Sequence, residues 1–128
     1  MLASIGVEPV EVRTPEELAT VDALVIPGGE STTIGRLARL YGLIDAIRER
    51  VESGMPVLGT CAGMIFLASG TVEYDQPQVR VLDAVVRRNA FGRQVDSFEA
   101  DLDVMGLDAP MHAVFIRAPW FDKVGGDV

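Results

Sequence analysis

Cysteine and histidine are nearly absent, since the 128 residues contain one of each, Cys61 and His112. A single cysteine cannot close an intrachain disulfide, so nothing indicates an oxidising compartment. Residues 1–4 show no basic region followed by an apolar run, and no apolar stretch approaches the ~20 residues that span a bilayer. We therefore predict a cytoplasmic protein with no secretory signal and no membrane partner.

Positive charge is also scarce, with 11 Lys and Arg against 19 Asp and Glu and a formal net charge of −8. This balance disfavours nonspecific binding to nucleic acid or to anionic membranes. Apolar residues make up 48% of the chain, which excludes a disordered acidic chain. We expect a single domain over residues 1–128, with a small molecule or another protein as its partner.

Two strand–turn–helix units occupy the first half of the chain. The apolar run at residues 23–26 ends at Gly28-Gly29, and apolar residues at helical spacing follow over residues 30–51. A second apolar run at residues 55–60 precedes a predicted helix over residues 62–68. Continuous apolar runs are typical of parallel strands covered on both faces, so the pattern predicts an α/β fold with helices on the faces of a parallel sheet.

Shorter elements flank these units. Residues 7–12 are predicted to form a strand, and residues 15–18 one helical turn, with Thr14 as N-cap and Glu17 completing a capping box. The second half shows strand-like runs without a long helix between them, which favours antiparallel or mixed additions to the sheet. These runs cover residues 79–86, 98–104 and 113–116.

The lone cysteine lies between two glycines, in Gly59-Thr60-Cys61-Ala62-Gly63, where the second predicted strand meets its helix. A sharp turn there lifts a side chain clear of the sheet, and the helix N-terminus supplies N–H groups that favour a thiolate and a developing oxyanion. G-x-C-x-G is the thiol counterpart of the serine nucleophile elbow. The alternative is that Cys61 is a small buried hydrophobe, because free cysteine is among the most buried residue types.

A second glycine turn, in the segment "PGGEST" at residues 27–32, also ends a strand and opens a helix. In a parallel sheet both turns lie at the carboxyl edge, where α/β folds build their sites. The N–H groups of the Gly28-Gly29 turn and of Ala62 are therefore placed to converge on one oxyanion. Taken by itself, this second segment is equally an ordinary tight turn before a capped helix.

The two turns, taken with "RRNAFGRQVDSFEADL" at residues 87–102 and "VFIRAP" at residues 114–119, resemble one family. It comprises the glutaminase subunits of pyridoxal 5′-phosphate synthase (the PdxT/SNO family), which are class I glutamine amidotransferases. The resemblance covers residues 7–119 and implies a flavodoxin-like three-layer sandwich with a mostly parallel central sheet, incomplete here. The two turns are shared, with variations, by related amidotransferases, whereas two longer motifs are specific to fewer of them: "RNAFGRQVDSFEA" and "FIRAP". These motifs indicate the vitamin B6 branch rather than an amidotransferase of another pathway.

The resemblance implies that L-glutamine is hydrolysed to glutamate and ammonia through a glutamyl thioester on Cys61. Ammonia then passes to the synthase subunit for pyridoxal phosphate synthesis, within a large heteromeric assembly on a dodecameric synthase core. Neither a metal nor a cofactor is implied for the glutaminase. The implied oxyanion-hole residues are Gly28, Gly29 and Ala62, and the implied glutamine-binding residues are Gly29, Glu30, Ser31, Arg88, Ile116 and Arg117.

These residue types suit glutamine. An arginine binds an α-carboxylate through paired hydrogen bonds, and the Glu30 carboxylate is able to form an ion pair with the α-ammonium group. Two alternatives stay open: an arginine after a strand is often a solvated surface residue, and Glu30 is able to favour the start of its helix through the dipole.

The chain departs from the family in its acid–base groups. Thioester chemistry needs a base for the thiol and an acid for ammonia, which the family takes from a His-Pro-Glu segment near its C-terminus. No such segment occurs here, and His112 does not match that position. We expect a domain that lacks the family's N-terminal strand and its His/Glu segment, exposes apolar sheet surface and is inactive alone. It is then either a piece of a working glutaminase or a non-catalytic module that docks on the synthase.

Overall fold

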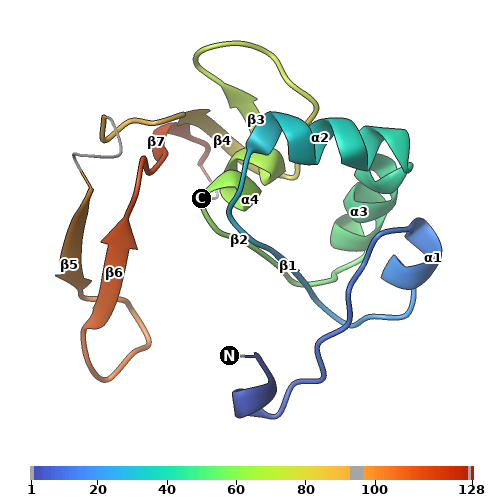
Figure 1. The fold of residues 1–128 in the computed structure, drawn as a ribbon, viewed down its shortest axis with the longest axis horizontal. Coiled ribbons are helices and arrows are strands. Elements are labelled where there is room, and N and C mark those ends of the chain that lie inside the picture. The colour runs from blue at the N-terminus through green and yellow to red at the C-terminus, as the bar shows by residue number, and fades with distance from the viewer. Residues whose placement is uncertain (1, 93–96, 127) are drawn as a thin grey trace.

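Two short parallel strands carry the turns described above. The computed structural model describes residues 2–92, 97–126 and 128 (Figure 1). In it β1 (Leu24–Ile26) pairs in parallel with β2 (Val57–Gly59), so that Leu24 lies opposite Val57. Each strand is followed by a helix, α2 (Ser31–Leu40) after β1 and α4 (Ala62–Leu67) after β2. Both predicted strand–turn–helix units are therefore confirmed.

The helices pack their apolar sides together on one face of this strand pair. α3 (Leu43–Glu52) follows α2 after Gly42, whose φ of 71° lies in the left-handed region and redirects the chain between the two helices. Phe66 of α4 is almost completely buried and lies at the centre of the resulting core. The core consists of Leu18, Ile26, Ala38, Ile47, Met55, Phe66, Leu67 and Val79.

The other face of the strand pair is open in the described part of the chain. Val25 and Leu58 lie opposite each other in the register, and their side chains are 43% and 59% exposed. The prediction that both strands are covered on both faces is therefore wrong for the described residues. The expected exposure of apolar sheet surface is found instead, since no described helix covers these two side chains.

The N-terminal segment is partly as predicted. A 3₁₀ turn (Leu2–Ile5) begins it, and α1 (Pro15–Leu18) starts with the expected capping box between Thr14 and Glu17. The predicted strand at residues 7–12 is wrong, since the chain there is extended but unpaired and mostly exposed. A strand needs a neighbour to accept its hydrogen bonds, and this segment has none among the described residues.

The second half forms two further small sheets. β3 (Ala68–Thr71) and β7 (Trp120–Val124) flank β4 (Leu82–Arg87), with β3 parallel and β7 antiparallel to it. β5 (Phe98–Leu102) and β6 (Met111–Phe115) form a separate antiparallel hairpin, which stands apart from the helices in Figure 1. The predicted mixed and antiparallel additions are confirmed, although the sequence did not predict β3 or β7.

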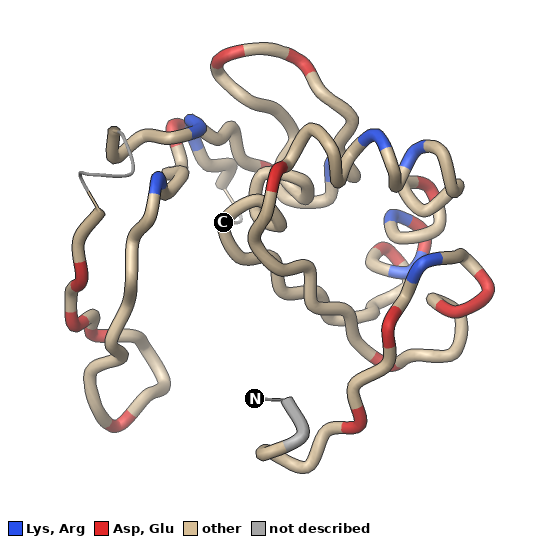
Figure 2. The backbone as a smooth tube through the Cα atoms, in the orientation of Figure 1, with Lys and Arg blue, Asp and Glu red and all other residues tan. Residues whose placement is uncertain are grey.

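Charge is distributed unevenly over these parts. Figure 2 shows acidic residues gathered along the β5–β6 hairpin and arginines on α2 and α3. Within the residues that the structure describes, no helix combines the length and apolarity that crossing a membrane requires.

Gly63 determines how closely α4 approaches β1. A Cβ atom at this position would lie 2.0 Å from the carbonyl oxygen of Ile26, well inside van der Waals contact. We therefore expect Gly63→Ala to lower the free energy of unfolding by about 1–3 kcal/mol, measured by urea denaturation. Gly70→Ala is the matched control, because a Cβ there meets nothing within 4 Å. Equal effects of the two substitutions would contradict this account of the packing.

Glu30 is the N-cap of α2, and its carboxylate accepts hydrogen bonds from the Thr32 and Thr33 amides at 3.0 and 2.7 Å. A further bond from the Thr33 hydroxyl contributes most to lowering the pKa of Glu30 from 4.5 to about 2, followed by the Thr32 and Thr33 amides. The interpretation that Glu30 supports the start of its helix is confirmed. A carboxylate with a depressed pKa stabilises the folded state above its unfolded pKa, and this contribution is lost as the pH falls toward the folded pKa.

We expect Glu30→Gln to lower the free energy of unfolding at pH 7 by about 0.3–1 kcal/mol, the range for an exposed charge at a helix N-terminus. The difference from the wild type should shrink as the pH falls from 4.5 toward about 2, where the wild-type carboxyl also becomes neutral. Urea denaturation across this range measures it. Glu8→Gln, outside any helix or strand, is the control. A wild-type advantage that persists unchanged at pH 2 would contradict the assignment.

Candidate functional site

Cys61 occupies a strained bend between β2 and α4. Its backbone has φ 51° and ψ −108°, in a region that residues with a side chain rarely adopt. Such a conformation costs on the order of 1–3 kcal/mol and persists only where the surrounding structure enforces it. The side chain is exposed, so the alternative of a small buried hydrophobe is wrong.

The two glycines that flank Cys61 make this bend possible. A Cβ at Gly59 would lie 2.6 Å from the carbonyl carbon of Gly63, and a Cβ at Gly63 would meet Ile26. The missing side chains allow α4 to fold back directly over the ends of β1 and β2. The amide of Thr60 also donates to the Ile26 carbonyl at 3.0 Å, which ties the residue before Cys61 to β1.

The Gly28-Gly29 turn lies against the thiol. A Cβ at Gly28 would lie 3.4 Å from Cys61 Cβ and 4.0 Å from its Sγ. The two glycine turns therefore meet, as the parallel pairing of β1 and β2 requires. Ala62 is the first residue of α4, and among the described residues neither its amide nor that of Gly29 donates a backbone hydrogen bond. Gly28 and Cys61 are the residues of the two turns that the structure brings into contact.

Arg88 reaches the same region from the end of β4. Its guanidinium donates to Glu30 Oε1 at 3.3 Å and lies over the Tyr74 ring, 4.9 Å from the ring centroid. The Arg88 side chain is only 16% exposed, so the alternative of a solvated surface arginine is wrong. Residues 30 and 88, far apart in the sequence, thus form an ion pair at the N-terminus of α2.

Ser31 contributes to the floor of this region rather than to its surface. Its side chain is 2% exposed, and its hydroxyl donates to Gln76 Oε1 at 3.4 Å. The sequence analysis missed Tyr74 and Gln76, which lie in the irregular segment between β3 and β4. The available signal was the polar stretch "EYDQPQ" between two strands, because connecting segments carry a large share of binding residues.

Ile116 and Arg117 follow β6 and are both exposed. A hydrogen bond from the Ala90 amide to the Ala118 carbonyl, 2.9 Å long, joins their segment to the one that carries Arg88. Within the described residues no hydrogen bond or ion pair connects Arg117 to Glu30 or Arg88. The structure therefore brings this segment beside the Arg88 loop without placing its side chains on the ion pair.

His112 is held within the β5–β6 hairpin. Its Nδ1 lies 2.8 Å from Asp101 Oδ1, and its Nε2 lies 3.1 Å from Glu99 Oε2. Both ring nitrogens are thus occupied by carboxylates of the neighbouring strand, and the side chain is 59% exposed. The interpretation of His112 as an exposed, satisfied strand histidine is confirmed. In the described ranges no cluster of three or more His, Cys, Asp or Glu is placed to hold a metal ion.

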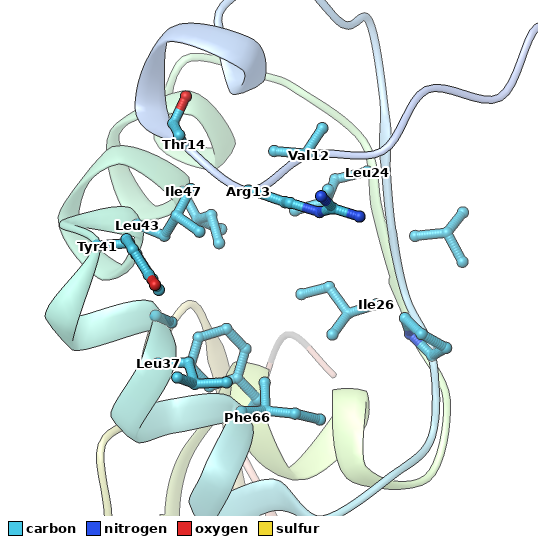
Figure 3. A pocket seen from close by; sticks show the side chains of 14 residues that line it. Val12, Arg13, Thr14, Leu24, Ile26, Leu37, Tyr41, Leu43, Ile47 and Phe66 are labelled. Atoms are coloured by element: carbon cyan, nitrogen blue, oxygen red, sulfur yellow. The ribbon is translucent and has the colours of Figure 1, made fainter.

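An apolar cavity of about 550 Å³ lies between β1 and helices α2 and α3 (Figure 3). Leu37, Ile26 and Phe66 point into it, with Tyr41 and Arg13 at its border. Neither Cys61 nor Arg88 is among the described residues that line it. The cavity is continuous with the core rather than with the thiol, which stands on the open surface at the two glycine turns.

Comparisons with known proteins agree with the geometry. A family described as the SNO glutamine amidotransferase family matches residues 1–128. The pyridoxal 5′-phosphate synthase subunit PdxT of Frankia alni is 59% identical over 130 residues, covering 99% of this chain and 65% of that protein. The same subunit of Nocardioides sp. is 58% identical, covering 100% of this chain and 65% of that protein. The chain thus spans slightly less than two thirds of the length of these relatives.

A crystal structure of a glutamine amidotransferase has the same fold, with a TM-score of 0.92 and 56% identity. The match covers 98% of this chain and 67% of that one. The expected fold class, an α/β fold of the class I glutamine amidotransferase type, is therefore confirmed. The chain belongs to the SNO glutamine amidotransferase family.

Proposed function

We propose that this chain is a glutaminase component of pyridoxal 5′-phosphate synthase, hydrolysing L-glutamine to glutamate and ammonia. The observation that carries the proposal is the strained, exposed Cys61 at the start of α4, with the Gly28-Gly29 turn in contact with it. A thiol presented beside two sets of backbone amides suits acyl transfer, because the amides stabilise charge that develops on the carbonyl oxygen.

In the proposed reaction the Cys61 thiolate attacks the side-chain amide carbon of glutamine. The negative charge that forms on the amide oxygen is stabilised by backbone N–H groups of Gly28, Gly29 and Ala62. The C–N bond breaks as the leaving nitrogen takes up the proton that the base removed from Cys61, so ammonia departs and a thioester remains. Water then attacks the thioester, releasing glutamate and restoring the thiol. His112 is not proposed as the base, since both of its ring nitrogens are bound to carboxylates. The resemblance assigns this task to a histidine and a glutamate of a His-Pro-Glu segment.

The Glu30–Arg88 pair is proposed to hold the α-amino-acid head group. A carboxylate and a guanidinium 3.3 Å apart are complementary to an α-ammonium and an α-carboxylate group. The pKa of Glu30, lowered to about 2 mainly by the Thr33 hydroxyl and the Thr32 and Thr33 amides, keeps it negative at neutral pH. Gly29, Ser31, Ile116 and Arg117 complete the proposed set of glutamine-binding residues.

The proposed partner is the synthase subunit, which receives the ammonia within a large heteromeric assembly. Relatives named as subunits of pyridoxal 5′-phosphate synthase support this choice. A cytoplasmic location is part of the proposal, because an exposed nucleophilic thiol functions only where it stays reduced. No metal or cofactor takes part in the proposed step.

Replacement of the nucleophile tests the proposal. In a protein that carries these residues together with the family's His-Pro-Glu segment, and with the synthase subunit present, we expect Cys61→Ala to lower glutamate release by at least about a thousandfold, because the acyl acceptor is lost. Mass spectrometry should detect a glutamyl adduct on Cys61 in that protein and none in its variant, whereas the 128 residues alone should show negligible hydrolysis because they lack the base. Unchanged glutamate release would overturn the assignment. Binding to the synthase without glutamate release by either protein would favour the non-catalytic docking module.

His112→Asn tests the location of the base. Because the ring is bound to Asp101 and Glu99 on the hairpin, we expect His112→Asn, made in the protein that carries the His-Pro-Glu segment, to leave glutamate release within about twofold of the same protein with His112. The same coupled assay of glutamate release measures it. A loss of activity as large as that of Cys61→Ala would show that His112 takes part in proton transfer.

A further inference from the structure

Tyr74, in the segment between β3 and β4, contacts two of the three segments that carry the proposed glutamine-binding residues. Its hydroxyl lies 3.2 Å from Thr32 Oγ1 in the first turn of α2. The face of its ring lies 4.9 Å from Arg88 Cζ, within the range of a cation–π contact. One side chain therefore links the α2 N-terminus to the arginine that follows β4.

Arg88 is held from several sides, and the segment around Tyr74 supplies most of the contacts. The guanidinium contacts both the Tyr74 ring and Glu30 Oε1. The amide of Arg88 donates to Glu73 Oε1 at 3.0 Å, so the residue before Tyr74 holds the backbone of the same arginine. A long flexible side chain is thereby fixed before any ligand arrives, which reduces the ordering cost of binding.

The segment that carries Tyr74 is itself anchored on α2. Gln76 is buried, and its Oε1 accepts hydrogen bonds from the hydroxyls of Ser31 at 3.4 Å and Thr32 at 3.3 Å. The Thr71 hydroxyl donates to the carbonyl of Tyr74. The segment around Tyr74 is thus hydrogen-bonded both to β3 and to α2, and these contacts fix the position of the Tyr74 ring.

We propose that Tyr74 is a positioning residue of the glutamine site, acting through Arg88. Its ring holds the guanidinium beside the Glu30 carboxylate, so that the pair is ready to receive the α-carboxylate and α-ammonium groups of the substrate. The proposal rests on the proposed function of this site. We expect the aromatic ring, which stacks on Arg88, to account for most of the contribution of Tyr74 to glutamine binding. The hydroxyl, which contacts Thr32, should contribute only a minor part.

A binding experiment with two ligands separates positioning from general structural support. Isothermal titration calorimetry would use a Cys61→Ala background, so that glutamine is not consumed. The ligands are L-glutamine and 4-aminobutanamide, which lacks the α-carboxylate. We expect Tyr74→Leu to weaken glutamine binding about three- to thirtyfold, the range of a partly buried cation–π contact, and to change 4-aminobutanamide binding less than about twofold. Tyr74→Phe, which keeps the ring, should bind glutamine within about twofold of the background.

Arg88→Met completes a double-mutant cycle. If Tyr74 acts through Arg88, Tyr74→Leu should add little further loss once Arg88 is replaced. Three outcomes would each overturn the inference while leaving the proposed function intact. In the first, Tyr74→Leu weakens the binding of both ligands equally; in the second, it leaves glutamine binding unchanged; in the third, its loss adds fully to that of Arg88→Met. Absence of glutamine binding in the Cys61→Ala background itself would overturn both the inference and the proposed substrate.

Discussion

The close contact between α4 and β1 is the constraint on which the site depends. Because Gly63 has no side chain, the helix lies directly against the Ile26 carbonyl, and the chain has only Thr60 and Cys61 in which to turn from β2 into α4. A connection of only two residues requires a sharp turn, and Cys61 makes it with a positive φ. The same helix buries Phe66 and Leu67 in the core, so hydrophobic burial holds the strained residue in place.

Glu30 connects the stability of the fold to the charge of the site. Its carboxylate caps α2 through the amides of Thr32 and Thr33 and at the same time pairs with Arg88. The cap keeps the carboxylate ionised and fixes its position, and the ionised carboxylate then orients the guanidinium. The N-terminus of α2 thus holds the Glu30 carboxylate, and the carboxylate in turn holds the Arg88 guanidinium.

The parts of the fold that were predictable are those with local signals. Thr14 and Glu17 mark a capping box, and the glycine turns mark the ends of β1 and β2. β3 and β7 were missed because their pairing with β4 is non-local and neither segment alternates clearly between apolar and polar residues. The bend at Cys61 was predicted from its pentapeptide together with the strand before it and the helix after it, whereas the proposed roles of Arg88 and Arg117 came only from the family resemblance. The Tyr74–Arg88 contact depends on the path of a loop and left no periodic signal.

The geometry separates two requirements of thiol catalysis. The bend exposes the Cys61 side chain beside Gly28, and the close approach of Gly59 and Gly63 to neighbouring backbone allows it. Proton transfer needs a titratable group, and the one histidine of the chain is bound within the β5–β6 hairpin. The rate at which the thiol reacts with an electrophile therefore reports on the exposure and ionisation of Cys61, whereas the proposed turnover of glutamine also requires the groups that transfer protons during the reaction. Comparing the two rates in one variant shows which requirement a substitution has affected.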